Sequence, residues 1–275
     1  MFSVLLSVYY NECPYFLRQS IDSLFYQSLQ PAEVVLVKDG DLTPELDNVI
    51  TECTAKYMHL RVVSLRQNQG LGKALNEGLK HCSYDLVARM DTDDIAKPDR
   101  FEKQIRAFQE HPELDVVGAW IDEFEGDTSN IVSTRKLPAS HDDIFRYAKS
   151  RCPVNHPAVM FKKQSVWNAG GYQHFPLFED YYLWVRMLMN GANFYNIQES
   201  LLFFRCSSNM YKRRGGWKYA IDECNFQNKM RQMGFISLQE CVKNISIRFT
   251  IRILPNFLRT IIYKNCLLYT SPSPR

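Results

Sequence analysis

The sequence predicts an α/β fold in which a mixed, mostly parallel sheet is flanked by helices. Two observations support this prediction. Apolar runs typical of buried strands alternate with amphipathic helical segments through the first 95 residues, with loops of ordinary length between them. Polar residues follow each of these strands. Because a strand, a helix and a second strand in succession favour a right-handed crossover, the alternation predicts a largely parallel sheet.

Four strands and three helices are expected in this first part of the chain. The strands are expected at 2–8, 33–40 including a closing turn, 60–65 and 84–91, and the helices at 14–28, 43–57 and 71–82. Thr43 suits the N-cap of the second helix and Pro44 its first helical position. Ligands of parallel sheets bind outside the carboxyl ends of the strands. We therefore expect functional residues in "SVYYNE", "VKDG", "LRQNQG" and "RMDTDD".

Elements after residue 95 follow one another less regularly. We expect a helix at 98–112, strands at 115–124 and 158–162, a helix at 179–191, strands at 192–197 and 200–205, and a charged helix at about 216–233. No internal repeat interrupts them. The chain is therefore expected to form one catalytic domain over 1–235, a basic amphipathic segment over 236–265 and an adapter-derived or disordered tail over 266–275.

Composition excludes several classes of protein. The 275-residue chain carries a formal charge of only +3, so we expect no nucleic-acid partner. Its eight cysteines are scattered without a C-x-x-C pair, which argues against a zinc knuckle and favours reduced thiols. The N-terminus lacks a basic region before its apolar run, and no apolar run reaches 18 residues. We therefore expect neither a signal peptide nor a transmembrane helix, and a cytoplasmic location.

The C-terminal part of the chain differs from the rest in charge. Glu240 is the last acidic residue and six basic residues follow it, so residues 1–240 carry a net charge of −3. Residues 241–265 interleave five of these basic residues with Ile, Phe and Leu, which fits either contact with a membrane surface or a helix packed on the domain. The last ten residues, "CLLYTSPSPR", match the reading frame of a library adapter, and the alternative is a disordered Ser/Pro tail.

Three aspartates lie at the end of the predicted strand at 84–91. Asp91, Asp93 and Asp94 lie within four residues of one another, where their charges repel. Several carboxylates at one strand end suit Mg²⁺ or Mn²⁺, which keeps open positions for phosphate oxygens. The alternative is that Asp94 or Asp99 caps the helix after Pro98. Together with the other strand ends, the cluster favours a site for a metal and a phosphate.

Other strand ends carry residues that are individually weak indicators. Asp39 could bind a nucleobase or ribose, or form an Asp-Gly turn. Gly70, Gly72 and Lys73 begin a helix whose N-terminal N–H groups favour an anion, although a glycine pair is often only a turn. Glu179 and Asp180 precede a helix, where carboxylates either cap or face a catalytic cleft.

Taken together, these stretches resemble glycosyltransferase family 2, which has the nucleotide-sugar-binding GT-A (Rossmann-like) fold. The resembling segments, in the family's order over about residues 2–206, are "SVYYNE", "VVLVKDG", "NQGLGKALNEGL", "RMDTDD", "NHPAVMFKK" and "FEDYYLWVRM". The nearest type is that of bacterial polysaccharide, capsule and O-antigen synthesis. Two departures exist: Lys38 replaces the family's usual acidic residue, and no histidine follows His174 to serve as a late metal ligand.

The resemblance implies a role for each matching residue. It implies nucleotide-sugar binding by Tyr9, Glu12, Asp39, Arg66, Lys73 and Asp91, metal binding by Asp93 with Asp91, catalysis by Asp180 as general base, and an acceptor or sugar pocket lined by His156, Glu179 and Trp184. An equal alternative for His156 is to hold the turn before Pro157. Asp94 is expected to be a structural cap.

The implied reaction is the inverting transfer of a sugar from a nucleotide sugar, expected to be a UDP-sugar, with Mn²⁺ or Mg²⁺ as cofactor. The acceptor is expected to be a glycan or an undecaprenyl-linked sugar, at the inner face of the plasma membrane. Arg213 and Arg214 could close over the diphosphate or form a solvated basic turn. A sugar-1-phosphate nucleotidyltransferase is the alternative enzyme, although "SVYYNECPY" lacks its glycine-rich loop. A further alternative is a non-catalytic nucleotide-sugar-binding module.

Overall fold

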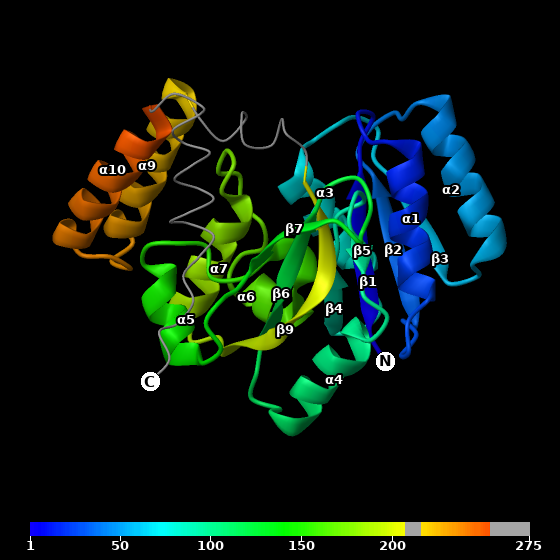
Figure 1. The fold of residues 1–275 in the computed structure, drawn as a ribbon, viewed down its shortest axis with the longest axis horizontal. Coiled ribbons are helices and arrows are strands. Elements are labelled where there is room, and N and C mark those ends of the chain that lie inside the picture. Colours follow the sequence, from blue (N-terminus) through cyan, green and yellow to red (C-terminus); the bar gives the residue numbers. More distant parts are fainter. Residues whose placement is uncertain (207–215, 254–275) are drawn as a thin grey trace.

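The computed structural model describes residues 1–206 and 216–253. Its nine strands form one sheet, in the order β3-β2-β1-β4-β8-β6-β9-β5, with β7 paired to β6 (Figure 1). The strands are β1 Ser3–Val8, β2 Glu33–Lys38, β3 Leu60–Ser64, β4 Leu86–Arg89, β5 Ile95–Ala96, β6 Val116–Phe124, β7 Ile131–Arg135, β8 Met160–Lys162 and β9 Phe194–Arg205.

Helices lie on both faces of the sheet (Figure 1). They are α1 Pro14–Phe25, α2 Pro44–Lys56, α3 Leu71–His81, α4 Arg100–Glu110, α5 His141–Ala148, α6 Lys163–Asn168, α7 Glu179–Met189, α9 Trp217–Gln232 and α10 Leu238–Ile253, with a 3-10 turn η1 at His156–Ala158. Thr43 caps α2 by accepting a hydrogen bond from the Leu46 N–H, and Pro44 begins the helix, as predicted.

The N-terminal half of the sheet is parallel, which confirms the prediction from the alternating elements. Strands β3, β2, β1 and β4 pair in parallel, and the middle of the sheet adds the long parallel pair β6–β9. The pairs β4–β8, β6–β8, β5–β9 and β6–β7 are antiparallel. The sheet is therefore mixed and mostly parallel.

Strand β9 is one continuous strand, although the sequence predicted two strands at 192–197 and 200–205. Its register against β6 shifts between Ala119 and Trp120, so that Ile197 and Ser200 lie opposite neighbouring residues. The polar residues Gln198 and Glu199 occupy this irregularity. A bulge of this kind interrupts the hydrophobic alternation without ending the strand, and this explains the wrong division.

Alternate residues of the buried strands face two separate cores. In β1, Val4 and Leu6 pack with α1, α2 and α4 on one face, whereas Leu5 packs with α3 and α7 on the other. This alternation is expected because successive side chains of a strand point to opposite faces. The second core also includes Phe226 and Met230 of α9, so it extends to the C-terminal helices.

Helices α9 and α10 form a hairpin that packs on the rest of the domain through buried polar contacts. Arg248 of α10 is ion-paired with Glu223 of α9 and also donates to the Ser150 carbonyl. Asn244 donates to the Lys149 carbonyl at 2.8 Å and to Gln227 Oε1 at 2.9 Å. The first part of the basic segment is therefore a docked helix, one of the two alternatives left open by its sequence.

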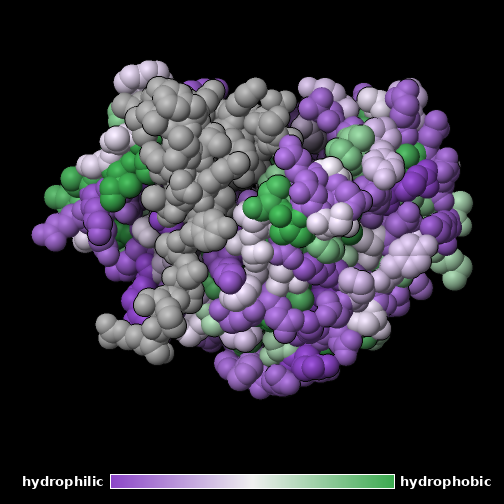
Figure 2. Space-filling view, viewed as in Figure 1, coloured by the Kyte–Doolittle hydropathy of each residue, from purple (hydrophilic) through white to green (hydrophobic). Residues whose placement is uncertain are grey.

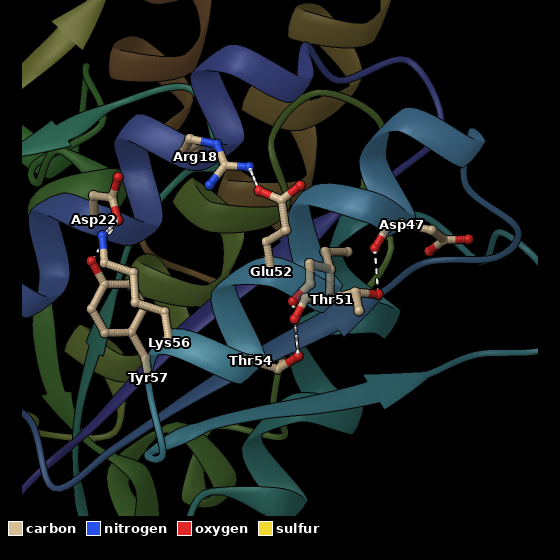
Figure 3. A network of polar contacts seen from close by, with 9 residues as sticks. Arg18, Asp22, Asp47, Thr51, Glu52, Thr54, Lys56 and Tyr57 are labelled. Atoms are coloured by element: carbon tan, nitrogen blue, oxygen red, sulfur yellow. Dashed lines mark hydrogen bonds and ion pairs between the residues drawn. The ribbon is translucent and has the colours of Figure 1, made fainter.

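A network of polar contacts joins α1 to α2 (Figure 3). Arg18 is ion-paired with Glu52, and Asp22 accepts from Lys56 Nζ at 3.0 Å and from the Tyr57 hydroxyl. Phe25 stacks on Tyr57 with ring centroids 3.9 Å apart. Exposed ion pairs of this type contribute at most about 1 kcal/mol each, so the apolar faces of the helices supply most of this packing.

Helix α3 approaches the sheet closely at Gly78. A Cβ atom on Gly78 would lie 2.3 Å from Leu5 Cδ1 and 2.7 Å from Val37 Cγ2. These two residues belong to β1 and β2, whose ends carry part of the candidate site. The absence of a side chain at Gly78 therefore sets the depth at which α3 packs.

We predict that Gly78→Ala destabilises the protein by a net of about 1–2 kcal/mol in denaturant unfolding, because overpacking outweighs the higher helix propensity of alanine. Lys80→Ala, an exposed position on the same helix, is the control and should change stability by less than about 0.5 kcal/mol. An unchanged or increased stability of Gly78→Ala would contradict this account of the packing.

Candidate active site

The candidate site lies where the parallel strands β1, β2 and β4 end. These strands are neighbours in the sheet, so the loops after Val8, Lys38 and Arg89 emerge at the same edge. Glu12 joins two of them, because its carboxylate accepts from the Thr92 hydroxyl at 2.8 Å and from the Cys13 N–H at 2.8 Å. The structure thus brings together the loop after β1 and the loop after β4.

Asp91, Asp93 and Asp94 form a compact acidic cluster after β4, with one carboxylate oxygen from each within 4.8 Å of the others. Burial, together with the charges of Asp91 and Glu12, raises the pKa of Asp93 to about 7. Burial and the neighbouring aspartates also raise the pKa of Asp94 well above its usual range. The cluster is therefore short of positive charge.

The donor set and its burial fit a divalent cation. Asp94 has no exposed surface, and its Oδ2 atom has no hydrogen-bond partner among the described residues. Carboxylate oxygens are the ligands that Mg²⁺ and Mn²⁺ prefer, and a cation would satisfy this oxygen and relieve the repulsion. Asp94 thus joins Asp91 and Asp93 as a third candidate ligand.

The expectation that Asp94 caps a helix is wrong. Helix α4 begins after Asp99, whose own carboxylate pairs with Lys103 and makes no capping hydrogen bond. Asp94 instead accepts the Arg205 N–H with its Oδ1 atom at 2.9 Å. Its role is therefore tertiary, and the local sequence around Pro98 could not show it.

Two fully buried arginines lie beneath the acidic cluster. Arg89 is ion-paired with Asp91, while its Nε and Nη1 atoms have no partner among the described residues. Arg100 donates to the Arg89 carbonyl at 2.7 Å and to Gln104 Oε1 at 3.1 Å. Sequence reasoning missed both residues. A charged residue inside the apolar run "YDLVARMD" was the available signal, because a buried arginine needs an acidic partner.

Asp39 is buried and holds the loop that precedes α3. Its carboxylate accepts from the Gln69 N–H at 2.7 Å and from the Gly70 N–H at 3.0 Å. The adjacent Gly40 has a φ of +86°, and a Cβ there would lie 2.5 Å from the Asn68 nitrogen. Asp39 therefore shapes the loop between β3 and α3 as well as lying at the strand end.

The remaining candidates for nucleotide binding that the structure describes lie around this edge of the sheet, and their side chains are exposed. Tyr9, Arg66 and Lys73 are exposed, on the loop after β1, the loop after β3 and the first turn of α3 respectively. Lys38, the departure from the family pattern, is ion-paired with Asp47 at 2.5 Å and so points towards α2. Arg213 and Arg214 lie outside the described residues.

Glu179 and Asp180 begin α7, and they lie near the start of α3. A Cβ on Gly72 of α3 would contact Tyr172 at 3.4 Å and Glu179 at 3.7 Å. Asp180 is partly buried, and its Oδ2 atom lies 3.7 Å from the Cys152 thiol. Burial raises the pKa of Asp180, against the opposing effects of the Tyr181 N–H, Arg89 and Arg135. A raised pKa suits a carboxylate that accepts a proton.

His156 and Trp184 are internal residues. The His156 ring lies 2.9 Å from the Tyr172 hydroxyl, and burial with the charge of Arg89 keeps the pKa of His156 well below its usual value. Trp184 has no exposed surface and packs against Phe161 and Phe194. The expectation that Trp184 lines an acceptor pocket is therefore wrong. Periodicity cannot distinguish a buried aromatic residue from one in a pocket.

Comparison with known proteins gives consistent similarities. Residues 5–168 match the family model described as glycosyl transferase family 2. The chain is 40% identical over 266 residues to the Escherichia coli UDP-Gal:alpha-D-GlcNAc-diphosphoundecaprenol beta-1,3-galactosyltransferase, which covers 97% of this chain and 96% of that protein. It is 43% identical over 239 residues to the amylovoran biosynthesis glycosyltransferase AmsE of Erwinia amylovora, covering 86% and 89%.

The fold is similar to that of a solved mannosyltransferase. PcManGT from Pyrobaculum calidifontis, whose structure contains GDP-Man and Mn²⁺, superimposes with a TM-score of 0.64 at 14% identity, covering 98% of this chain and 81% of that chain. This likeness confirms the GT-A type of fold that the sequence resemblance implied. Among the described residues, no helix is both long enough and apolar enough to cross a membrane.

Proposed function

Because the chain belongs to glycosyl transferase family 2, we propose that it transfers a sugar from a UDP-sugar, with inversion and with the help of a divalent cation, to a lipid-linked acceptor in surface polysaccharide synthesis. The main supporting observation is the acidic cluster at the end of β4, with an unpartnered buried carboxylate oxygen. The family assignment and relatives at 40–43% identity contradict the alternatives of a nucleotidyltransferase and a non-catalytic module.

In this proposal the strand ends of the parallel half bind the donor. Asp93 and Asp91, joined by Asp94, would hold the cation, and Asp91 would also contact the donor sugar or ribose. The loop from Tyr9 to Glu12 and the carboxylate of Asp39 face the base and ribose. The exposed side chains of Arg66 and Lys73 complete the nucleotide site. Arg213 and Arg214, which lie outside the described residues, are proposed to contribute to the same site.

Charge determines how the leaving group departs. A cation bound at the cluster would supply Lewis-acid stabilisation to the leaving diphosphate. The three carboxylates of the cluster would hold this cation. Arg89 pairs with Asp91 and so lowers the negative charge that the cluster presents to the diphosphate. Glu12 holds the adjacent loop through Thr92, so the donor site keeps its shape during the reaction.

Asp180 is the proposed general base. It accepts the proton of the acceptor hydroxyl, whose oxygen then attacks the anomeric carbon on the side opposite to the diphosphate. One base and one in-line displacement give inversion. Glu179 lies beside it, and His156 supports this region from inside through Tyr172. The Escherichia coli relative acts on a GlcNAc-diphosphoundecaprenol, and this supports an undecaprenyl-linked acceptor for the present chain.

Contact with the membrane surface is part of the proposal. On α10, Asn244 and Arg248 face the domain, whereas Leu238, Val242 and Ile247 are exposed. Hydrophobic surface is visible on the part of the molecule that α9 and α10 form (Figure 2). Exposed apolar side chains on a helix that also carries basic residues suit the interfacial region of an anionic membrane, where a polyprenyl-linked acceptor would be presented.

The function is tested by measuring release of UDP from a panel of UDP-sugars, with a short-chain polyprenyl-diphosphate sugar as acceptor. We expect release with one donor, loss of release in EDTA, and recovery with Mn²⁺ or Mg²⁺, because the leaving diphosphate needs the cation. Full activity in EDTA would show that the metal assignment is wrong. Release of pyrophosphate from UTP and a sugar 1-phosphate would instead show the other enzyme class.

Asp180→Asn is expected to lower the turnover number by about 10²–10⁴-fold while leaving UDP-sugar affinity nearly unchanged, because only proton transfer is removed. The acid limb of the wild-type pH–rate profile should lie above pH 3.8, since burial raises the pKa of this base and only its charged form accepts a proton. Asp142→Asn, an exposed carboxylate in the first turn of α5, is the matched control. Wild-type turnover in Asp180→Asn would place the base elsewhere.

For the membrane proposal, the double variant Val242→Gln and Ile247→Gln should bind anionic vesicles at least about tenfold more weakly in sedimentation, because two apolar side chains no longer enter the interface. The matched control replaces Ile131 and Val132 of β7, which are similarly exposed but lie away from α10, by glutamine. Equal sedimentation of wild type and the α10 variant would rule out this contact.

A further inference from the structure

Arg205, the last residue of β9, lies beside the acidic cluster although it is 111 residues away from Asp94 in sequence. Its guanidinium carbon lies 3.9 Å from the centroid of the Phe16 ring and 4.6 Å from that of Phe124. These rings belong to α1 and β6, so the side chain is held between two different elements. Stacking on aromatic faces restricts a guanidinium to one plane and stabilises its charge.

Three hydrogen bonds then fix the position of Arg205. Its N–H donates to Asp94 Oδ1 at 2.9 Å, its Nε to the Asp93 carbonyl at 2.8 Å, and its Nη2 to Gln19 Oε1 at 2.8 Å. The residue therefore contacts two of the three clustered aspartates, one through its carboxylate and the other through its backbone.

The form of these contacts is informative. Among the described residues, Arg205 makes no ion pair with a carboxylate, whereas Arg89 pairs with Asp91. Because Arg205 binds Asp93 by its carbonyl oxygen, the Asp93 carboxylate stays available. Because the Arg205 N–H takes only Oδ1 of Asp94, the Oδ2 atom also stays available, and that atom has no partner in the described part of the chain.

The sheet places Arg205 at this position. Strand β5, which follows the cluster directly, pairs with β9 so that Ile95 lies opposite Phe203 and Ala96 opposite Leu202. Arg205 therefore extends past the end of this pairing and meets the carbonyl of Asp93 and the carboxylate of Asp94. One residue thus joins the loop after β4 to α1, β6 and β9.

We propose that Arg205 is a positioning residue for the metal site: it fixes the Asp93–Asp94 backbone so that free carboxylate oxygens of both residues face one cation. This inference rests on the metal dependence in the proposed function. Residues that orient ligands without touching the metal typically change metal affinity by about 10–100-fold when they are replaced. Arg205 contributes positive charge and geometry to the cluster while leaving its ligand oxygens free.

The test is the affinity for Mn²⁺ in the presence of UDP, measured by calorimetry and by the electron paramagnetic resonance signal of free Mn²⁺, without turnover. Arg205→Met should bind Mn²⁺ about 10–100-fold more weakly, whereas Arg205→Lys, which keeps the positive charge, should lose less. Both variants keep the main-chain N–H that Asp94 accepts. Gln19→Leu removes one hydrogen bond of Arg205, together with the one that Gln19 donates to the exposed Tyr15 hydroxyl. It should weaken binding a few-fold, and it serves as the readout if Arg205→Met does not fold.

Arg186 provides the matched control. It is a buried arginine on α7 that stacks on Tyr182 at 4.5 Å and donates to the carbonyls of Ala169 and Gly171, but it lies away from the cluster. Arg186→Met should reduce thermal stability without changing Mn²⁺ affinity. The inference would be overturned, and the proposed function left standing, by either of two results. One is wild-type Mn²⁺ affinity in both Arg205→Met and Gln19→Leu, and the other is an equal loss of affinity in Arg186→Met. Absence of Mn²⁺ binding by the wild type would overturn it together with the proposed metal dependence.

Discussion

The carboxylates of Asp91, Asp93 and Asp94 approach to within 4.8 Å of one another at the end of a buried strand, and their repulsion is the constraint to which the surrounding structure responds. Burial and the neighbouring charges raise the pKa of both Asp93 and Asp94, so the cluster needs positive charge to remain ionised near neutral pH. Arg89, which pairs with Asp91, and Arg205, which contacts Asp93 and Asp94, supply part of it. A bound divalent cation would supply the rest.

A few close contacts position the loops and helices around the acidic cluster. The order of strands β2, β1 and β4 brings three loops to one edge, and Asp39 holds the loop before α3 through two backbone N–H groups. Gly78 lets α3 pack tightly on β1 and β2, which keeps the start of that helix near Glu179. The donor loops and the proposed base therefore belong to one rigid framework, as catalysis by orientation requires.

Sequence reasoning located the candidate residues within the fold better than it described their environments. Asp91, Asp93, Asp39 and Asp180 stand at strand or helix ends that the hydrophobic pattern marked clearly, and their placement follows from the topology of a parallel sheet. Their catalytic and binding roles stay predictions. The same reasoning treated Asp94 as a cap and Trp184 as a pocket residue. Both predictions failed because segments distant in the sequence bury these residues.

By itself, the sequence determined the succession of strands and helices up to residue 95, the parallel pairing of their sheet and the acidic cluster at its edge, since local periodicity and short crossovers carry that information. Only the tertiary structure decided which charges compensate the cluster. Arg205 reaches Asp93 and Asp94 through the pairing of β5 with β9, and Arg248 docks α10 through Glu223. Such contacts join segments far apart in the chain, so no local pattern of residues specifies them.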